Sequence, residues 1–162
     1  LIRIFTHVKP GYFIRSMYPV QLFAFTTSSS AVTLPVNLNT VQNKLKVSEE
    51  VSSFVLPVGV TINMDGTSCY QAIAVIFIAQ VLNIDLTLIQ MLTIIFMTVL
   101  SSIGTPGIPG GSYVILTMVL TSVGIPAEGL ALILGIDRPL DMLRTSVNVT
   151  GDATVACIVD GK

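Results

Sequence analysis

Long apolar stretches alternate with short polar clusters along this chain, and each cluster interrupts the apolar pattern. Residues 86–127 contain no Asp, Glu, Lys or Arg, a run about twice the roughly 20 residues that one membrane crossing needs. The sequence GTPGIPGGS at 104–112 divides this run, because its four glycines and two prolines break a helix. The pattern therefore predicts two apolar helices joined by a glycine-rich tip, which form a helical hairpin over residues 86–123.

A similar hairpin is predicted earlier in the chain, over residues 11–45. The apolar residues 12–27 end in a run of hydroxyl side chains, TTSSS at 26–30. Such side chains compete for the hydrogen bonds of the backbone, so the run suits the tip of a hairpin, where Ser30 can cap the next helix. Each arm is too short to span a bilayer, which favours a re-entrant hairpin. The alternative is that residues 28–30 are a plain N-terminal cap.

An interrupted helix is predicted over residues 48–82. Ser48, Glu49 and Glu50 are typical of a helix start, since serine caps the helix and acids favour its first turn. The sequence NMDGT at 63–67 then breaks the apolar pattern with an amide, an acid and a glycine. A break at membrane depth is tolerated only where it is buried in protein or lines a polar cavity. We expect it to lie close to both hairpin tips; the alternative is a surface turn between two helices.

The final predicted helix, residues 130–159, has a charged face. Asp137, Asp141, Arg144, Asn148 and Asp152 follow one another at spacings of four or three residues, so they share one side of the helix. Ionisable groups in so apolar a chain are costly and mark ion or substrate pathways. The alternative is the solvated face of an ordinary amphipathic helix.

The composition indicates a membrane protein. Hydrophobic residues make up 52% of the 162 residues and charged residues 10%, against about a quarter charged in ordinary soluble domains, and the mean hydropathy is +0.83. The net charge of −1 gives no nucleic-acid footprint. We predict an all-α membrane protein with two re-entrant helical hairpins and two transmembrane helices, one of them interrupted. Residues 1–10 are expected to end a preceding helix or loop of a longer protein.

Other kinds of site are not supported by the residues. Cys69 and Cys157 lie in apolar segments without metal-ligand spacing, so we expect buried free thiols. The glycine-rich tip is not followed by Lys-Ser or Lys-Thr, which argues against a nucleotide site. No nucleophile–base pair or metal cluster suggests an enzyme.

The two halves of the chain repeat one plan. Residues 11–82 contain a hairpin and then an interrupted helix, and residues 86–159 contain a hairpin and then a helix with a polar face. Paired interrupted segments in corresponding halves are typical of the midplane binding site of a secondary transporter. The rival from another class is a non-transporting or channel-forming membrane segment.

Four motifs together resemble the dicarboxylate/amino acid:cation symporters, the glutamate transporter family. They are TSSS at 27–30, NMDGT at 63–67, SIGTPGIPGG at 102–111 and DRPLDMLRTSVNVTGD at 137–152. The resemblance implies that residues 11–159 are the inverted-repeat core of a transport domain. It also implies that an N-terminal scaffold half, which forms a homotrimer in this family, is absent from the chain. We expect an integral protein of the lipid bilayer, in the plasma (inner) membrane of a prokaryote.

The resemblance also implies a set of substrate residues. Arg144 would bind the side-chain carboxylate of the substrate, since a guanidinium can grip it bidentately, and Asp141 would bind its ammonium group. The other substrate residues would come from both tips, the helix break and the last helix: Ser28, Ser29, Thr67, Ile108, Pro109, Gly110, Gly111, Ser112, Thr145 and Asn148.

Sodium sites are implied in the same way, since hard cations prefer oxygen ligands. One set comprises Gly59, Asn63, Asn148 and Asp152. A second set comprises backbone groups near Thr61, Ser102, Ile103 and Thr105. A third set comprises Asp65 with Asn63, completed by residues of the absent half.

The substrate is predicted to be glutamate or aspartate, co-transported with sodium ions. The alternative is a sodium- or proton-coupled symporter for C4-dicarboxylates, which Asp141 argues against because a dicarboxylate has no ammonium group. A neutral substrate would leave the charge of Arg144 unpaired. Thr27 and Met142 stand where some relatives have an arginine, although Arg138 adds a charge nearby. A counter-transported ion is therefore left open.

Overall fold

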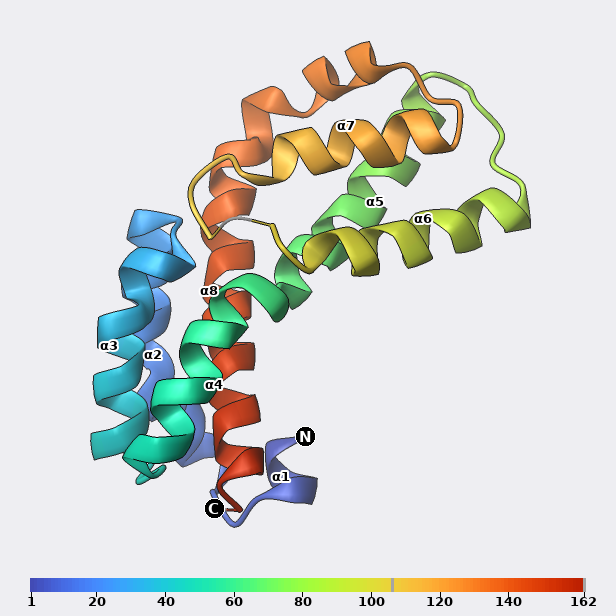
Figure 1. Cartoon of the computed structure of the whole chain (residues 1–162). Coiled ribbons are helices and arrows are strands. Elements are labelled where there is room, and N and C mark those ends of the chain that lie inside the picture. Colours follow the sequence, from blue (N-terminus) through green and yellow to red (C-terminus); the bar gives the residue numbers. More distant parts are fainter. Residues whose placement is uncertain (106, 162) are drawn as a thin grey trace.

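The computed structural model describes residues 1–105 and 107–161, and it contains helices and loops but no strand within those ranges, so the all-α prediction is confirmed. The helices in chain order are α1 (Ile2–Phe5), α2 (Pro10–Thr27), α3 (Ser30–Asn43), α4 (Glu49–Ile62), α5 (Asp65–Val81), α6 (Leu88–Ser102), α7 (Ser112–Ser122), the 3₁₀ helix η1 (Ala127–Leu132) and α8 (Leu134–Val159). Helices α2, α3 and α4 lie in one lobe and α5, α6 and α7 in the other, while α8 runs through both (Figure 1).

The first hairpin consists of α2 and α3, which lie side by side (Figure 1). Its tip is two residues long. Ser28 ends α2 in the left-handed region, with φ of 51°, and Ser29 caps α3 by accepting a hydrogen bond from the Val32 amide. The predicted cap, Ser30, is instead the first residue of α3. The chain turns one residue earlier because Ser28 adopts the left-handed conformation that a short reversal requires.

The predicted helix break separates α4 from α5. Ser48 caps α4, and the helix ends at Ile62. Asn63 and Met64 form the break, and α5 begins at Asp65. Met64 is 3% exposed, and Gly66 and Thr67 are also buried, whereas Asp65 is exposed. One side of the break therefore packs against the protein, in contrast to a turn that is exposed on all sides.

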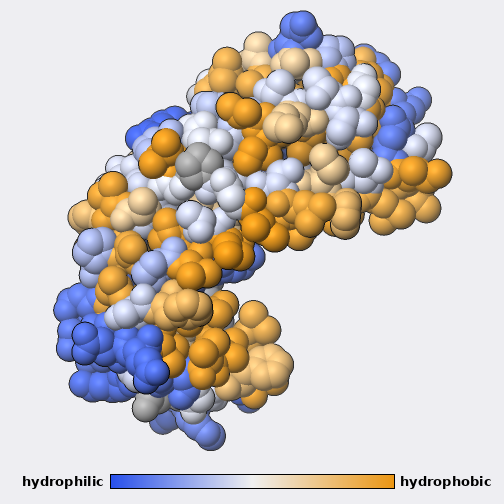
Figure 2. All heavy atoms as spheres, in the orientation of Figure 1, coloured by the Kyte–Doolittle hydropathy of each residue, from blue (hydrophilic) through white to orange (hydrophobic). Residues whose placement is uncertain are grey.

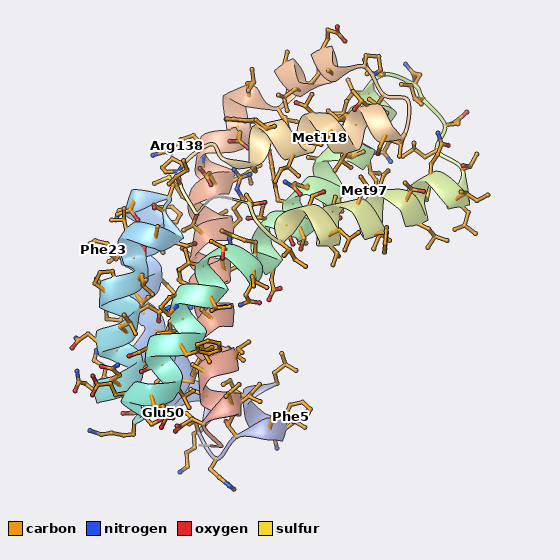
Figure 3. The ribbon with its side chains drawn as sticks, viewed as in Figure 1. Phe5, Phe23, Glu50, Met97, Met118 and Arg138 are labelled. Atoms are coloured by element: carbon orange, nitrogen blue, oxygen red, sulfur yellow. The ribbon has the colours of Figure 1, made fainter. Side chains whose placement is uncertain are left out.

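The second hairpin consists of α6 and α7. Helix α6 starts with a capping box between Thr87 and Gln90. The residues between α6 and α7 form the tip, where Gly104 and Gly110 have φ values of +94° and +76° that other residues rarely adopt. Pro106 lies outside the described residues. Figure 3 labels Met97 on α6 and Met118 on α7, with Phe23 near the tip of the first hairpin.

Helix α8 joins two separate apolar cores. Its C-terminal half contributes Val149, Ala153, Ala156 and Cys157 to a core with α2, α3 and α4. The second core is built from α5, α6, α7 and the connection to α8, including Ile133 just before α8 begins. The middle of α8 therefore lies between the two cores. The final helix was predicted to begin at residue 130, but η1 occupies residues 127–132 and α8 begins at Leu134.

Apolar side chains cover much of the surface, as Figure 2 shows along α6. Leu88, Ile89 and Phe96 of this helix are 72%, 77% and 63% exposed. Extended apolar surface of this kind marks a face that contacts other protein or lipid. The structure does not show the two predicted transmembrane helices: within the described ranges, no helix is both long enough and apolar enough to cross a bilayer by itself.

Candidate functional site

The polar face of α8 is buried and its apolar face is exposed. The five polar residues of the stripe, from Asp137 to Asp152, are each at most 5% exposed. On other sides of the helix, Leu143 and Val147 are 54% and 52% exposed. A helix of a soluble protein has the opposite arrangement. The alternative of a solvated charged face is therefore wrong.

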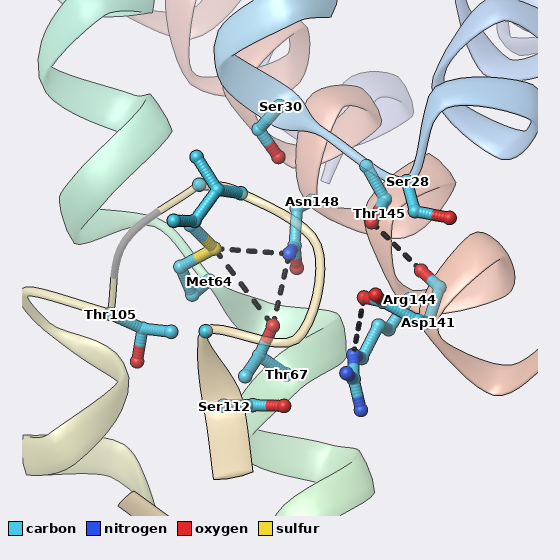
Figure 4. A pocket seen from close by; sticks show the side chains of 13 residues that line it. Ser28, Ser30, Met64, Thr67, Thr105, Ser112, Asp141, Arg144, Thr145 and Asn148 are labelled. Carbon is cyan, nitrogen blue, oxygen red and sulfur yellow. Dashed lines mark hydrogen bonds and ion pairs between the residues drawn. The ribbon is translucent and has the colours of Figure 1, made fainter. Parts of the chain in front are cut away.

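Asp141, Arg144 and Asn148 of the buried stripe line a pocket together with both hairpin tips and the break between α4 and α5 (Figure 4). The pocket volume is about 20 Å³, which is room for little more than one water molecule. The lining residues are Ser28, Ser30, Met64, Thr67, Thr105, Gly107, Ile108, Gly111, Ser112, Asp141, Arg144, Thr145 and Asn148. Nine of these were predicted as substrate residues: Ser28, Thr67, Ile108, Gly111, Ser112, Asp141, Arg144, Thr145 and Asn148.

The two tips touch one another, as expected from the repeated plan. The Ser29 hydroxyl donates to the Gly107 carbonyl at 2.7 Å, and the Ala31 amide donates to the same oxygen at 3.3 Å. A side chain at Gly107 would lie 3.0 Å from a methyl group of Val60. The tip therefore packs closely against α4 at Gly107, and a larger residue there would require Val60 to shift.

Asn148 joins the helix break to α8. Its side-chain oxygen accepts from the Gly66 amide at 2.8 Å, and its amide donates to the Thr67 hydroxyl at 3.1 Å. Gly66 lies so close to α8 that an added Cβ would be 2.5 Å from the Arg144 carbonyl oxygen. The break thus exposes a backbone amide that one buried side chain satisfies, which explains why the interruption is stable inside the molecule.

Arg144 lies between two buried carboxylates. Its Nε donates to Asp141 at 3.0 Å and its NH1 to Asp137 at 3.2 Å, and the guanidinium lies 4.4 Å from the centre of the Tyr70 ring. Asp141 also accepts from the Gly110 amide of the second tip at 3.3 Å, and Arg138 lies 3.7 Å from it. A guanidinium has five N–H donors, so Arg144 retains donors for an anion.

Sequence analysis did not identify the partners of Asp137. The Tyr70 hydroxyl donates to one oxygen of Asp137 at 2.5 Å, and the Tyr113 hydroxyl donates to the other at 2.7 Å. Buried tyrosine hydroxyls usually find a polar partner, so tyrosines in otherwise apolar helices were the available signal. The pairing itself depends on how α5, α7 and α8 pack.

Two serine hydroxyls of the pocket have no partner. Ser28 and Ser112 are 2% and 3% exposed, and neither side-chain oxygen forms a hydrogen bond within the described residues. Both line the pocket, one from each tip. Buried hydroxyls normally have partners, so these two can bind a polar ligand without breaking an existing contact.

The remaining predicted substrate residues have other positions. Ser29 and Gly110 do not line the pocket, although each bonds a group of the tips or of α8 as described above. Pro109 is exposed and also lies outside the pocket lining. The side chain of Ile108 is 57% exposed although the residue lines the pocket.

Residues predicted to bind sodium form two groups. In the first, the Asn63 amide donates to Asp152 at 2.9 Å, Gly59 lies directly against the Asp152 side chain, and Gly151 leaves room for Asn63 and Asp65. Asn148, predicted for the same set, bonds the helix break instead.

The second group joins the ends of α4 and α6. The Gly104 amide donates to the Thr61 carbonyl at 2.8 Å, and the Thr105 amide donates to the Ser102 carbonyl at 3.2 Å; Ile103 lies between them in the chain and is 51% exposed. No group of three or more His, Cys, Asp or Glu that could hold a metal ion occurs in residues 1–105 and 107–161. The first group offers carboxylate, side-chain amide and carbonyl oxygens, and the second offers backbone carbonyl oxygens; hard cations accept all of these as ligands.

The two cysteines differ in exposure. Both are free, and Cys157 is buried as predicted. Cys69 is exposed, so the prediction that it is buried is wrong. It follows the helix break on a side of α5 that α8 does not cover completely, next to a groove lined by residues of both helices.

Comparison with known proteins gives one family. The sodium:dicarboxylate symporter family matches residues 1–162. Similar relatives include excitatory amino acid transporter 1 of Ambystoma tigrinum, 47% identical over 96% of this chain and 28% of its own length. An excitatory amino acid transporter of Caenorhabditis elegans is 44% identical over 95% of this chain and 31% of its own length. Excitatory amino acid transporter 4 of Mus musculus is 45% identical over 96% of this chain and 28% of its own length.

These comparisons confirm the resemblance that the four motifs indicate. The family and these relatives are transporters, in agreement with the prediction that the chain is not an enzyme. The chain spans less than a third of the length of these relatives. The three relatives are animal proteins, so the predicted prokaryotic origin finds no support.

Proposed function

Because this chain belongs to the sodium:dicarboxylate symporter family, we propose that it is the substrate-binding part of a secondary carrier. The carrier couples sodium influx to the uptake of an acidic amino acid, glutamate or aspartate, by alternating access across the plasma membrane. Residues 11–159 form the moving transport domain, built from hairpin 11–45, interrupted helix 48–82, hairpin 86–123 and final helix 130–159. Both hairpins re-enter the bilayer, and an N-terminal scaffold assembles the full-length carrier as a homotrimer.

The observation that carries this proposal is the burial of Arg144 and Asp141 side by side in a pocket that also contains two unpartnered hydroxyls. An acidic amino acid has a cation and two carboxylates, and these groups complement the site. Arg144 takes the distal carboxylate and Asp141 takes the ammonium group. Ser28 and Ser112 supply hydrogen bonds for the remaining polar atoms.

The other residues of the pocket complete the binding of the substrate. Thr67, Thr145 and Asn148 contact its polar edges, Ser29 holds the first tip in place, and residues 108–112 form the lid, where glycine lets the backbone approach the ligand closely. Since the pocket holds little more than one water molecule, the substrate binds only when the second tip moves away from α8.

Sodium ions are the co-transported cargo. Asp152 with Asn63 and Gly59 forms one site, and Asp65 with Asn63 contributes to another. The backbone near Thr61, Ser102, Ile103 and Thr105 forms a third. The Asp152 carboxylate is 1% exposed, and Arg144 of the same helix pairs with Asp137 and Asp141 instead. A cation that binds beside Asp152 offsets its burial.

The second candidate function is symport of C4-dicarboxylates. One contact favours it: Arg138 lies 3.7 Å from Asp141 and partly compensates its charge without a substrate ammonium group. This contact is weaker support than the buried pair, because the Arg138 side chain is 59% exposed and exposed ion pairs contribute little.

The proposal is tested with the full-length carrier in proteoliposomes. Uptake of labelled aspartate is measured with and without an inward sodium gradient, and unlabelled glutamate, succinate or serine is added as competitor. We expect sodium-dependent uptake that glutamate inhibits more strongly than succinate. Inhibition by succinate as strong as that by glutamate would favour the dicarboxylate carrier. Uptake at the same rate with and without the sodium gradient would contradict sodium coupling.

A further inference from the structure

Asp137 joins three helices through its two carboxylate oxygens. It is 1% exposed. Tyr70 of α5 and Arg144 of α8 both donate to Oδ1, at 2.5 and 3.2 Å. Tyr113 of α7 donates to Oδ2 at 2.7 Å. Oδ1 of Asp137 thus accepts hydrogen bonds from α5 and α8, and Oδ2 accepts one from α7 of the second hairpin.

Tyr113 is placed where it can control that tip. It is the second residue of α7, directly after the loop that covers the pocket. Across residues 1–105 and 107–161, its bond to Asp137 is the one hydrogen bond that links a side chain of α7 to α8. The tip's own bond to α8, from the Gly110 amide to Asp141, is longer at 3.3 Å. The tyrosine bond is therefore the firmer of the two attachments.

We propose that Tyr113 is the positioning residue of the second tip: its hydroxyl, bound to Asp137, holds the tip closed over the pocket. This inference rests on the proposed function for the identity of the ligand, but the contact itself does not. Opening the tip far enough to admit a ligand separates α7 from α8 and breaks this bond. A hydrogen bond to a charged group is among the stronger ones, so its loss shifts the balance towards the open tip by roughly tenfold or more.

The same contact links ligand binding to closure. Arg144 now donates to Asp137 and to Asp141. When a ligand carboxylate binds the remaining donors of the guanidinium, it shares the positive charge of Arg144 with Asp137, so Tyr70 and Tyr113 provide more of the compensation of the Asp137 charge. The tyrosine bonds strengthen, because a hydrogen bond to a less compensated charge is stronger. A bound acidic ligand therefore closes the tip more firmly than no ligand does.

The test measures tip opening directly in the full-length carrier, with its other accessible cysteines replaced, Cys69 among them. A reporter thiol is introduced by Ser30→Cys, because Ser30 lines the pocket from the first hairpin and is only 3% exposed. Its rate of alkylation is measured with and without saturating aspartate. Tyr113→Phe keeps the ring and removes only the hydroxyl. Tyr18→Phe is the matched control, since Tyr18 is 63% exposed and far from the tip in α2.

We expect Tyr113→Phe to raise the alkylation rate roughly tenfold, to leave less protection by aspartate, and to leave the buried Cys157 unlabelled. An unchanged rate at the reporter would overturn the proposal. Faster labelling of Cys157 as well would also overturn it, because the hydroxyl would then support the whole fold. If Tyr113→Phe raises the alkylation rate of the reporter but aspartate protects the reporter neither with nor without this change, the positioning role is upheld and the proposed substrate is contradicted.

Discussion

The Arg144 guanidinium and the Asp141 carboxylate are bonded to each other at 3.0 Å, although each residue is only 5% exposed. They are three residues apart on α8 and form part of the wall of one pocket. Burying an ion pair is unfavourable unless good geometry and further hydrogen bonds compensate it. Asp137 and the Gly110 amide provide that compensation here. A zwitterionic ligand can replace these internal partners with its own charges.

Replacing Arg144 with cysteine tests which ligand group it binds. Arg144→Cys removes the partner of the distal carboxylate, so aspartate uptake is expected to fall by thirty-fold or more, which corresponds to the roughly 2–5 kcal/mol lost when one member of a buried charge pair is removed. Serine uptake is expected to persist or increase, because serine has no distal carboxylate. Arg15→Cys is the control, since Arg15 is exposed on α2. If both variants transport aspartate equally well, Arg144 does not bind the substrate.

Alanine substitutions at two helical glycines, Gly66 and Gly135, test how closely α5 packs on α8. Gly66→Ala places a methyl group 2.5 Å from the Arg144 carbonyl oxygen, a backbone atom that cannot rotate away. We expect a loss of stability of about 1–3 kcal/mol from overpacking. At Gly135, also helical, an added Cβ meets nothing within 4 Å, and Gly135→Ala is expected to be neutral or slightly stabilising. Thermal unfolding of both variants in detergent provides the comparison, and equal melting temperatures would contradict the observed packing of α5 on α8.

Asp152 is expected to set the sodium dependence of transport. Asp152→Asn keeps a side chain that can bond Asn63 but removes the charge that a cation would compensate. The sodium concentration for half-maximal uptake should rise about tenfold or more at saturating substrate, as expected for the loss of one charge-assisted contact. Asp85→Asn, in the exposed loop before α6, should leave it unchanged. An unaltered sodium dependence in Asp152→Asn would remove this residue from the cation site.

Much of the architecture could be predicted because the residues that interrupt the helices are recognisable in the sequence. Glycine, proline and runs of hydroxyl residues locate the two tips and the interruption at Asn63. The spacing of the charged residues correctly indicates one shared face of α8. The exact helix caps could not be predicted. Ser29 rather than Ser30 caps α3, because the left-handed residue is Ser28, and three consecutive serines do not show which of them adopts this conformation.

Contacts that depend on tertiary packing could not be predicted from the sequence. Nothing local to Tyr70 or Tyr113 indicates that both reach Asp137, because the three residues come from helices far apart in the chain. The exposure of Cys69 likewise depends on which side of α5 faces α8. The sodium ligands and the roles of the substrate residues stay predictions that the experiments above address.

The most direct test of the central claim asks whether Asp141 binds the amino group of the substrate. Uptake of labelled aspartate and labelled succinate is measured in the full-length carrier with and without Asp141→Asn. Aspartate has an ammonium group to lose and succinate does not, so aspartate uptake is expected to fall by thirty-fold or more while succinate uptake changes little. An equal fall for both substrates would contradict the account, because Asp141 would then support the pocket without recognising an amino acid.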